Sequence, residues 1–240
     1  MSHPDHATSA GRPPLRDVLL PFAASLACIG ALYTGDLDTQ LTARFFDEAR
    51  GVWPFRDRGT WPTWIHRGVT DLVFLTALSA LVVAVRQRFK RADPVLAARA
   101  TLLVATIAST TLIVALLKSV SPDPSPWDAT TFGGAITHGK LFQSSVPPGH
   151  TGHASPGAHA SGVFALMALY YCWCEAHLTR ARIALVAAWL AGSAAGVNQV
   201  LRGAHYPSHN YWSALLAWAI ATTLYFTLFR GKLGARDTPR

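Results

Sequence analysis

The chain has 240 residues, of which half are apolar and only 14% are charged, against about 25% charged residues in an average soluble domain. The charges gather in short patches between long uncharged stretches, which argues against a soluble core and favours a membrane protein with short loops. The net charge of +8 does not indicate a nucleic-acid partner, because the sequence has no basic helix with interleaved aromatic residues and no nucleic-acid-binding motif. We therefore predict an all-α, polytopic membrane protein.

In chain order, residues 1–14 are polar and proline-rich, and we expect a disordered cytoplasmic N-terminus without a cleavable signal. Six apolar segments then have the length of membrane-spanning helices: 15–34, 68–85, 95–117, 160–176, 183–201 and 211–229. Residues 15–230 are predicted to form one six-helix membrane domain, followed by a basic cytoplasmic tail at 231–240. The loop 118–159 is rich in Pro, Gly, Ser and His and should be irregular.

Basic residues predict the orientation of these helices. The densest cluster is Arg86, Arg88, Lys90 and Arg91, in the short loop between the second and third spans. Such loops stay in the cytoplasm, and an even number of spans then places both termini there. The loops after the first, third and fifth spans should face the periplasm or outer side of a bacterial-type inner (plasma) membrane.

Histidines concentrate on the outer side in this topology. Of the ten histidines, those on the outer side or at outer helix ends are His66, His138, His150, His153, His159, His205 and His209. A neutral imidazole can attack phosphorus, and a second imidazole can protonate the leaving oxygen. The helix N-terminus after Gly157 adds free N–H groups that suit phosphate oxygens. This combination predicts phosphoryl transfer, although a histidine cluster can also bind metal.

Three stretches resemble the motifs of the type 2 phosphatidic acid phosphatase family. The first family motif is Lys, six residues and Arg-Pro, and here Lys118 is followed by six residues and Ser125-Pro126. The second is Pro-Ser-Gly-His, which residues 156–159 (Pro-Gly-Ala-His) match in shape. The third is Ser-Arg, five residues, His, three residues and Asp, and residues 198–209 keep this spacing from Asn-Gln through His205 to His209.

The resemblance implies roles for particular residues. It implies His205 as the nucleophile, His159 as the general acid and base, and Lys118 as a phosphate ligand. The N–H groups at Gly157 and Ala158 would cradle the phosphate. His209 stands where the family has the aspartate that orients the nucleophile, and a neutral imidazole should do this more weakly than a carboxylate.

This chain departs from the family pattern at both motif arginines. Ser125 and Gln199 stand in their positions, and neither carries the charged planar fork that binds phosphate oxygens. Arg202, one helical turn from Gln199, is our candidate substitute. His150 is an alternative acid/base, because residues 147–150 (Pro-Pro-Gly-His) also match the second motif. His159 is preferred because the apolar helix follows it at once.

We therefore predict an integral-membrane, metal-independent phosphatase without a cofactor, which hydrolyses a lipid phosphate or diphosphate through a phosphohistidine. Its partners would be the bilayer and the lipid phosphate substrate. The missing arginines motivate an alternative, a degenerate relative that binds phosphorylated lipid without hydrolysing it. A third possibility is a metal-binding or transport protein that uses the outer histidines.

Overall fold

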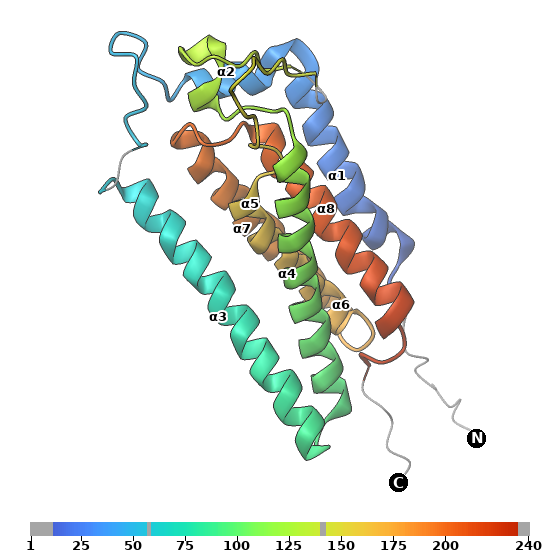
Figure 1. Cartoon of the computed structure of the whole chain (residues 1–240). Coiled ribbons are helices and arrows are strands. Elements are labelled where there is room, and N and C mark those ends of the chain that lie inside the picture. Colours follow the sequence, from blue (N-terminus) through green and yellow to red (C-terminus); the bar gives the residue numbers. More distant parts are fainter. Residues whose placement is uncertain (1–11, 57–58, 140–142, 235–240) are drawn as a thin grey trace, which may run out of the picture.

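The computed structural model describes residues 12–56, 59–139 and 143–234. These residues form a helical bundle whose only β-structure within the described ranges is isolated bridges (Figure 1). In chain order the α-helices are α1 (Leu15–Tyr33), α2 (Leu37–Ala43), α3 (Trp61–Lys90), α4 (Pro94–Val120), α5 (Ala158–Phe164), α6 (Leu169–Cys174), α7 (Leu178–Leu201) and α8 (Pro207–Leu224). Short 3₁₀ turns link them at Thr34–Asp36, Pro126–Asp128, Thr130–Phe132 and Ala165–Ala168, and the π-helical turn Tyr225–Phe229 extends α8.

Five helical segments are long and apolar enough to cross a membrane: Leu15–Ala43, Trp61–Lys90, Pro94–Val120, Leu178–Leu201 and Pro207–Phe229. A shorter apolar segment, Ala158–Cys174, corresponds to the predicted fourth span and consists of α5, a 3₁₀ turn and α6. The prediction of an all-α, polytopic fold is confirmed.

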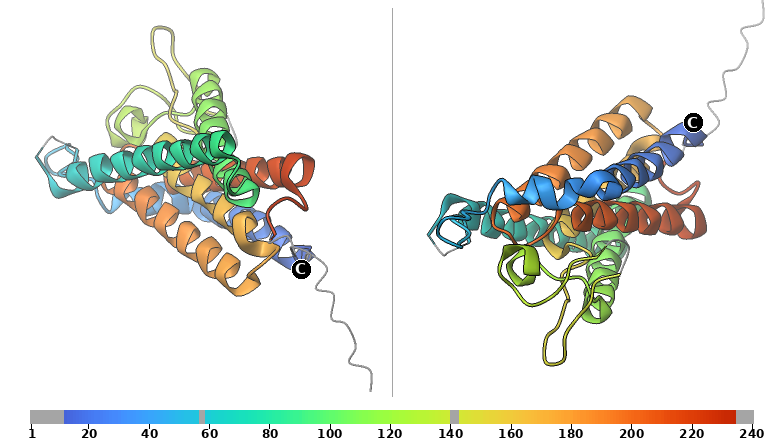
Figure 2. Two further views of the ribbon diagram at one scale, coloured as in Figure 1. Left: turned by 90° about the horizontal axis from the view of Figure 1, so that it is seen from below. Right: turned by 90° about the horizontal axis from the view of Figure 1, so that it is seen from above.

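The short segment formed by α5 and α6 lies in the middle of the bundle, between α4, α7 and α8 (Figures 1 and 2). Helix α1 packs on α8, whereas α3 lies at the outside and packs mainly on α4. Most large apolar side chains of α3 are exposed, including Leu72, Phe74, Leu75, Leu78, Leu81 and Val82. In a bilayer such side chains contact lipid, while each helix satisfies its own backbone groups.

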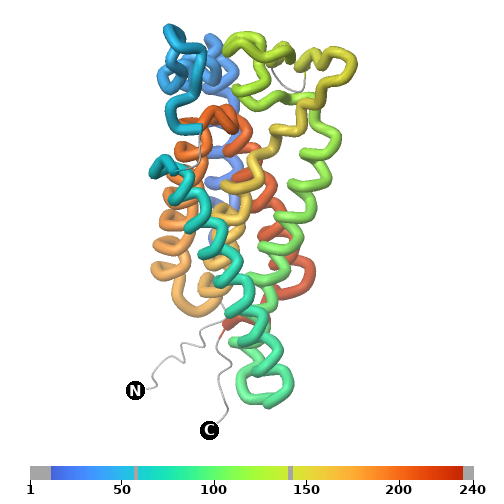
Figure 3. The backbone as a smooth tube through the Cα atoms, turned by 60° about the vertical axis from the view of Figure 1, so that its left-hand side comes forward, coloured from blue at the N-terminus to red at the C-terminus, as the bar shows by residue number. Residues whose placement is uncertain are grey.

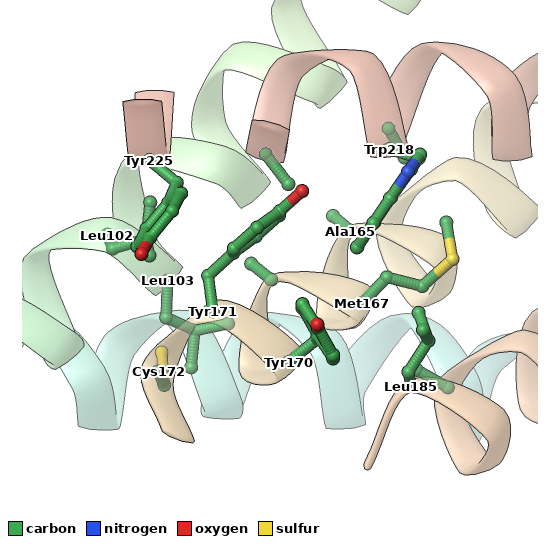
Figure 4. Close-up of a cluster of buried hydrophobic side chains, with 14 of the residues drawn as sticks. Leu102, Leu103, Ala165, Met167, Tyr170, Tyr171, Cys172, Leu185, Trp218 and Tyr225 are labelled. Atoms are coloured by element: carbon green, nitrogen blue, oxygen red, sulfur yellow. The ribbon is translucent and has the colours of Figure 1, made fainter. Parts of the chain in front are cut away.

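The helices are packed at their centre by a layer of buried aromatic rings (Figure 4). The Tyr171 ring stacks on Tyr225 with centroids 4.4 Å apart and on Trp218 with centroids 4.9 Å apart. Trp218 also donates its indole N–H to the carbonyl of Val18 at 2.8 Å. These contacts join α1, α6 and the C-terminal half of α8.

Three helices begin at least four residues earlier than the sequence predicts. Helix α3 begins at Trp61 rather than at 68, α7 at Leu178 rather than at 183, and α8 at Pro207 rather than at 211. Proline in the first turn of α3 and α8 suits a helix start, because its missing N–H has no intrahelical partner there. Polar residues in these first turns lower the local hydropathy, so the apolar run begins later than the helix does. As a result His66 lies on a helix and not in a loop.

The bundle has two distinct ends (Figure 3). The turn between α3 and α4, the start of α1 and the end of α8 share one end, whereas the segments 44–56, 121–139 and 143–157 cover the other. Of the predicted tail, Leu233 is buried, and its N–H donates to Glu175 at 3.0 Å. Residues 1–11 and 235–240 lie outside the described ranges, so the predicted disordered N-terminus and most of the tail stay predictions.

Candidate active site

The segment that follows α4 runs beside the segment that precedes α5. The N–H of His153 donates to the carbonyl of Ser121, and the N–H of Ala154 donates to the carbonyl of Asp123, both at 2.9 Å. The Nδ1 atom of His153 also lies 2.9 Å from the carbonyl oxygen of Lys118. The first and second motif stretches are thus held together by backbone pairing.

The first stretch also contacts the turn between α7 and α8. Trp127 donates its indole N–H to the carbonyl of Arg202 at 2.5 Å and its backbone N–H to the carbonyl of Gly203 at 3.3 Å. Gly203 has a φ of +70°, and a Cβ there would lie 2.4 Å from a ring atom of Trp53. Glycine is therefore required both by the backbone conformation and by the close approach of the indole.

The second and third stretches meet at the start of α5. The N–H of Gly157 donates to the carbonyl of His209 at 2.9 Å, and the hydroxyl of Ser213 donates to the carbonyl of Gly157 at 2.9 Å. The three stretches are therefore joined in pairs. The N–H of Gly157, which we expected to hold phosphate, is used in this packing.

A pocket of about 320 Å³ opens where the three stretches meet. It brings together most of the predicted site residues: Lys118, Ser125, His159, Gln199, Arg202 and His205. It is also lined by residues without a predicted role: His66, Trp127, Asp128, Gly152, His153, Ala154 and Ala204. Four predicted residues, Gly157, Ala158, His209 and the alternative His150, are outside this described lining.

The predicted nucleophile His205 is buried at the wall of the pocket. Burial, the nearby Lys118 charge and His159 together lower the pKa of His205 to about 3. Its ring is therefore neutral near pH 7, which is the state that a nucleophilic imidazole needs. Its Nδ1 has no hydrogen-bond partner among the described residues.

His209 lies behind His205, with ring centroids 5.9 Å apart and planes at 73°. Neither nitrogen of His209 has a hydrogen-bond partner within the described part of the chain. The structure places His209 beside His205 without a direct hydrogen bond to it. That His209 orients His205 stays a prediction.

Further polar groups that we did not predict form a buried layer around His209. The ring of His138 stacks on Tyr206 with centroids 3.9 Å apart, and its Nε2 lies 3.9 Å from a carboxylate oxygen of Asp38. Burial lowers the pKa of His138 to about 4. Asp38 accepts hydrogen bonds from the N–H of Ser208, at 2.9 Å, and from its hydroxyl. This carboxylate of α2 therefore caps the start of α8, where anions are stabilised.

Two cations face the pocket, although both motif arginines are missing. Lys118, in the last turn of α4, and Arg202 line it. Arg202 donates to the side-chain oxygen of Gln199 at 3.3 Å. Ser125 donates its hydroxyl to Asp128 at 2.6 Å. The position of the first missing arginine is thus occupied by a neutral side chain held by a carboxylate, and Arg202 supplies the nearby charge.

His66 is the main site residue that the sequence analysis did not assign. Its position among the outer histidines was a signal, but the predicted helix start at 68 left it in a loop. Its ring packs on His159 with centroids 3.7 Å apart. Among the residues that the structure describes, no group of three or more His, Cys, Asp or Glu side chains is arranged to hold a metal ion.

The fold and pocket define a membrane protein with a histidine- and cation-lined site at one end of its helices. A model of the PAP2 superfamily matches residues 99–232, and the chain belongs to this family. No curated protein sequence matches the chain. The fold is similar to the crystal structure of the first transmembrane PAP2 type phosphatidylglycerolphosphate phosphatase from Bacillus subtilis, with 15% identity and a TM-score of 0.46, covering 90% of this chain and 99% of that one.

The family and the apolar helices together support a membrane phosphatase. The predicted resemblance to the type 2 phosphatidic acid phosphatases is confirmed at the level of the family.

Proposed function

We propose that the chain hydrolyses the phosphate ester or anhydride of a membrane lipid, with His205 as the nucleophile. The observation that carries this proposal is the shared pocket of His205, His159, Lys118 and Arg202. It combines two imidazoles with two cations at the end of a helical bundle. These are the groups that a phosphoryl transfer needs for attack, proton transfer and charge stabilisation.

In the first step a ring nitrogen of His205 attacks phosphorus, and the bond between phosphorus and the lipid oxygen breaks. His159, in its protonated form, gives that oxygen a proton and becomes neutral, and the lipid leaves as an alcohol or a monophosphate. In the second step His159, now the base, takes a proton from water, whose oxygen attacks the phosphohistidine. Inorganic phosphate leaves, and His205 is regenerated.

The cations act on the oxygens that do not leave. Negative charge on these oxygens shifts in the transition state, and donors fixed beforehand stabilise it best. Lys118 and Arg202 would hold these oxygens from the two sides of the pocket that α4 and α7 provide. This reaction uses only side chains of the protein, so we propose that it is independent of metal.

The proposed location is the outer leaflet. The pocket is lined by residues of the segments 121–139 and 143–157, and these segments lie at the end opposite the turn between α3 and α4 (Figure 3). Arg86, Arg88 and Lys90 lie in the last turns of α3, and Arg91 directly follows it. Basic loops stay in the cytoplasm, so the pocket would face the periplasm of a bacterial-type inner membrane, with both termini cytoplasmic.

A second candidate is a relative that binds phosphorylated lipid without turnover. The neutral Ser125 and Gln199 favour it, because they remove two charged forks from the family pattern. The nitrogens of His209, which have no hydrogen-bond partner among the described residues, favour it as well. Under this alternative the lipid would bind at Lys118 and Arg202, and no phosphate would be released.

The experiment that separates the two is phosphate release by the purified protein in detergent. Phosphatidate, phosphatidylglycerol phosphate, undecaprenyl diphosphate and a lipid A preparation are offered with a chelator present, beside the variant His205→Ala. We expect release from at least one lipid and loss of release in the variant. A folded protein that binds these lipids and releases no phosphate would support the second candidate instead.

A further inference from the structure

We propose that His66 of α3 binds the transferred phosphoryl group, in place of the arginine that the third motif lacks. This inference rests on the proposed phosphatase function and names a further catalytic residue for it. His66 lies before the residues 99–232 that the family model matches. It nevertheless lines the same pocket as His159 and His205.

Two neighbouring side chains of α7 bring α3 to the pocket. Asn198 donates to the carbonyl of Pro62 at 3.1 Å, and Gln199 donates to Nδ1 of His66 at 3.0 Å. Both side chains are buried. Asn198 and Gln199 occupy the Ser-Arg positions of the third motif. In this chain the two side chains at these positions therefore contact α3.

The hydrogen bonds of Gln199 fix which atom of His66 can donate. Arg202 donates to the Gln199 oxygen at 3.3 Å, so the Gln199 nitrogen is the atom that faces Nδ1 of His66 at 3.0 Å. An amide nitrogen donates only, so Nδ1 accepts, and the neutral ring carries its hydrogen on Nε2. This tautomer gives His66 a donor for a phosphate oxygen.

The position of His66 also suits the reacting centre. Its ring centroid lies 3.7 Å from that of His159, with the planes at 44°. A phosphoryl group within reach of the predicted acid/base is therefore near His66 too. Gln199 links His66 to Arg202, so the two donors would approach the phosphate as one connected unit. An imidazole offers fewer donors than a guanidinium, so the replacement is weaker than the lost arginine.

The first test compares His66→Ala with Ile65→Ala, its neighbour on the exposed side of α3. Phosphate release gives kcat and KM, and inhibition by orthovanadate, an analogue of the transferred group, gives Ki. We expect His66→Ala to lower kcat/KM and raise the vanadate Ki, each by about 10- to 100-fold, the range for one hydrogen bond to a charged group. Ile65→Ala should stay within about twofold of the wild type, as surface changes do.

The second test is rescue by charge. The double variant His66→Ala, Gln199→Arg returns the arginine of the motif and removes the ring that Gln199 contacts. We expect it to recover about tenfold of the lost kcat/KM, equal to one charged hydrogen bond. His66→Gln serves in place of His66→Ala if the alanine variant does not fold, as judged by circular dichroism and gel filtration.

Unchanged kcat, KM and vanadate Ki in a folded His66 variant would overturn the inference. If His205→Ala is inactive at the same time, the phosphatase function stands and only the role of His66 fails. If the wild type releases no phosphate from any lipid, calorimetric titration with vanadate decides: weaker binding to the His66 variant supports the inference, and equal binding overturns it.

Discussion

The protonation state of one buried ring limits the chemistry of the pocket. The pKa of His205 is lowered to about 3, first by burial and then by Lys118 and His159. A free imidazole with a pKa of about 6.5 would be protonated in part of the molecules at mildly acidic pH. The buried ring keeps its lone pair there, so the proposed nucleophile would need no separate base to deprotonate it.

We predict that His205 stays neutral on acidification to about pH 5, because burial removes most of the water that would stabilise its charged form. The unfolded chain takes up a proton near pH 6.5, so it binds more protons than the folded protein between about pH 6.5 and 3. The contribution of His205 to the free energy of unfolding is thus present above pH 6.5 and decreases as the pH falls through this window. The measurement is NMR of ¹³C-histidine-labelled protein, with His205→Gln for assignment. A resonance that titrates near pH 6.5 would contradict the prediction.

Arg202 is predicted to carry the charge that the two motif positions lack. Its replacement by alanine should lower kcat/KM by about 100- to 1,000-fold, as removal of a fixed donor to a developing anion does. Arg202→Lys should recover part of this, because an ammonium keeps the charge but cannot match the planar fork.

The matched control is Arg67→Ala. The guanidinium of Arg67 lies 5.7 Å from the ring centroid of Trp64, and Arg67 is outside the described pocket lining. Steady-state assays on both variants should show a large loss for Arg202 alone. Equal losses would mean that general surface charge, and not a phosphate contact, explains the effect.

At the scale of elements, the turn between α7 and α8 sets the position of both Arg202 and His205. We predict that Gly203→Ala lowers the free energy of unfolding by about 1–3 kcal/mol, because the left-handed backbone at this position disfavours a Cβ and the new Cβ overlaps Trp53 and Trp127. Gly133→Ala is the control, since Gly133 also has a positive φ (+86°) but no atom of the described residues lies within 4 Å of the added Cβ. Denaturation curves should show the larger loss at 203. Equal losses would assign the effect to φ alone.

The sequence predicts the membrane helices well because the length of an apolar run matches the thickness of the bilayer. It does not predict their first turns, where polar and aromatic residues continue the helix beyond the apolar run. The start of α3 at Trp61 is the clearest case, and the short helix α2, which follows α1, is not predicted either. Helix α2 depends on packing, since its buried Asp38 caps α8 far along the chain.

The sequence also predicts some residues of the candidate site and not others. Motif spacing predicts that Lys118, His159 and His205 meet, because each is tied to the end of a recognisable helix. It does not predict His66, whose place depends on the side chains of Asn198 and Gln199 across the interface between α3 and α7. Nor does it predict that the N–H of Gly157 is used by the carbonyl of His209.

At the scale of the whole molecule, the orientation in the membrane is a prediction of its own. We expect a cysteine at Thr151, near the pocket, to react with an impermeant maleimide in intact cells, and a cysteine at Arg88 to react only after lysis. Both positions are exposed, and the natural cysteines Cys28, Cys172 and Cys174 are replaced by alanine. The reverse labelling would place the pocket in the cytoplasm.

The most direct test of the proposed chemistry is a search for the phosphohistidine itself. The variant His159→Gln should slow the attack of water more than the transfer to His205 when the leaving group is good, so a phosphoenzyme should accumulate. We would incubate it with ³²P-labelled undecaprenyl diphosphate and quench in alkali. We predict an acid-labile, alkali-stable label that maps to His205 and is absent from the double variant His159→Gln, His205→Ala. Turnover by the wild type without such a label, or a label on another residue, would contradict it.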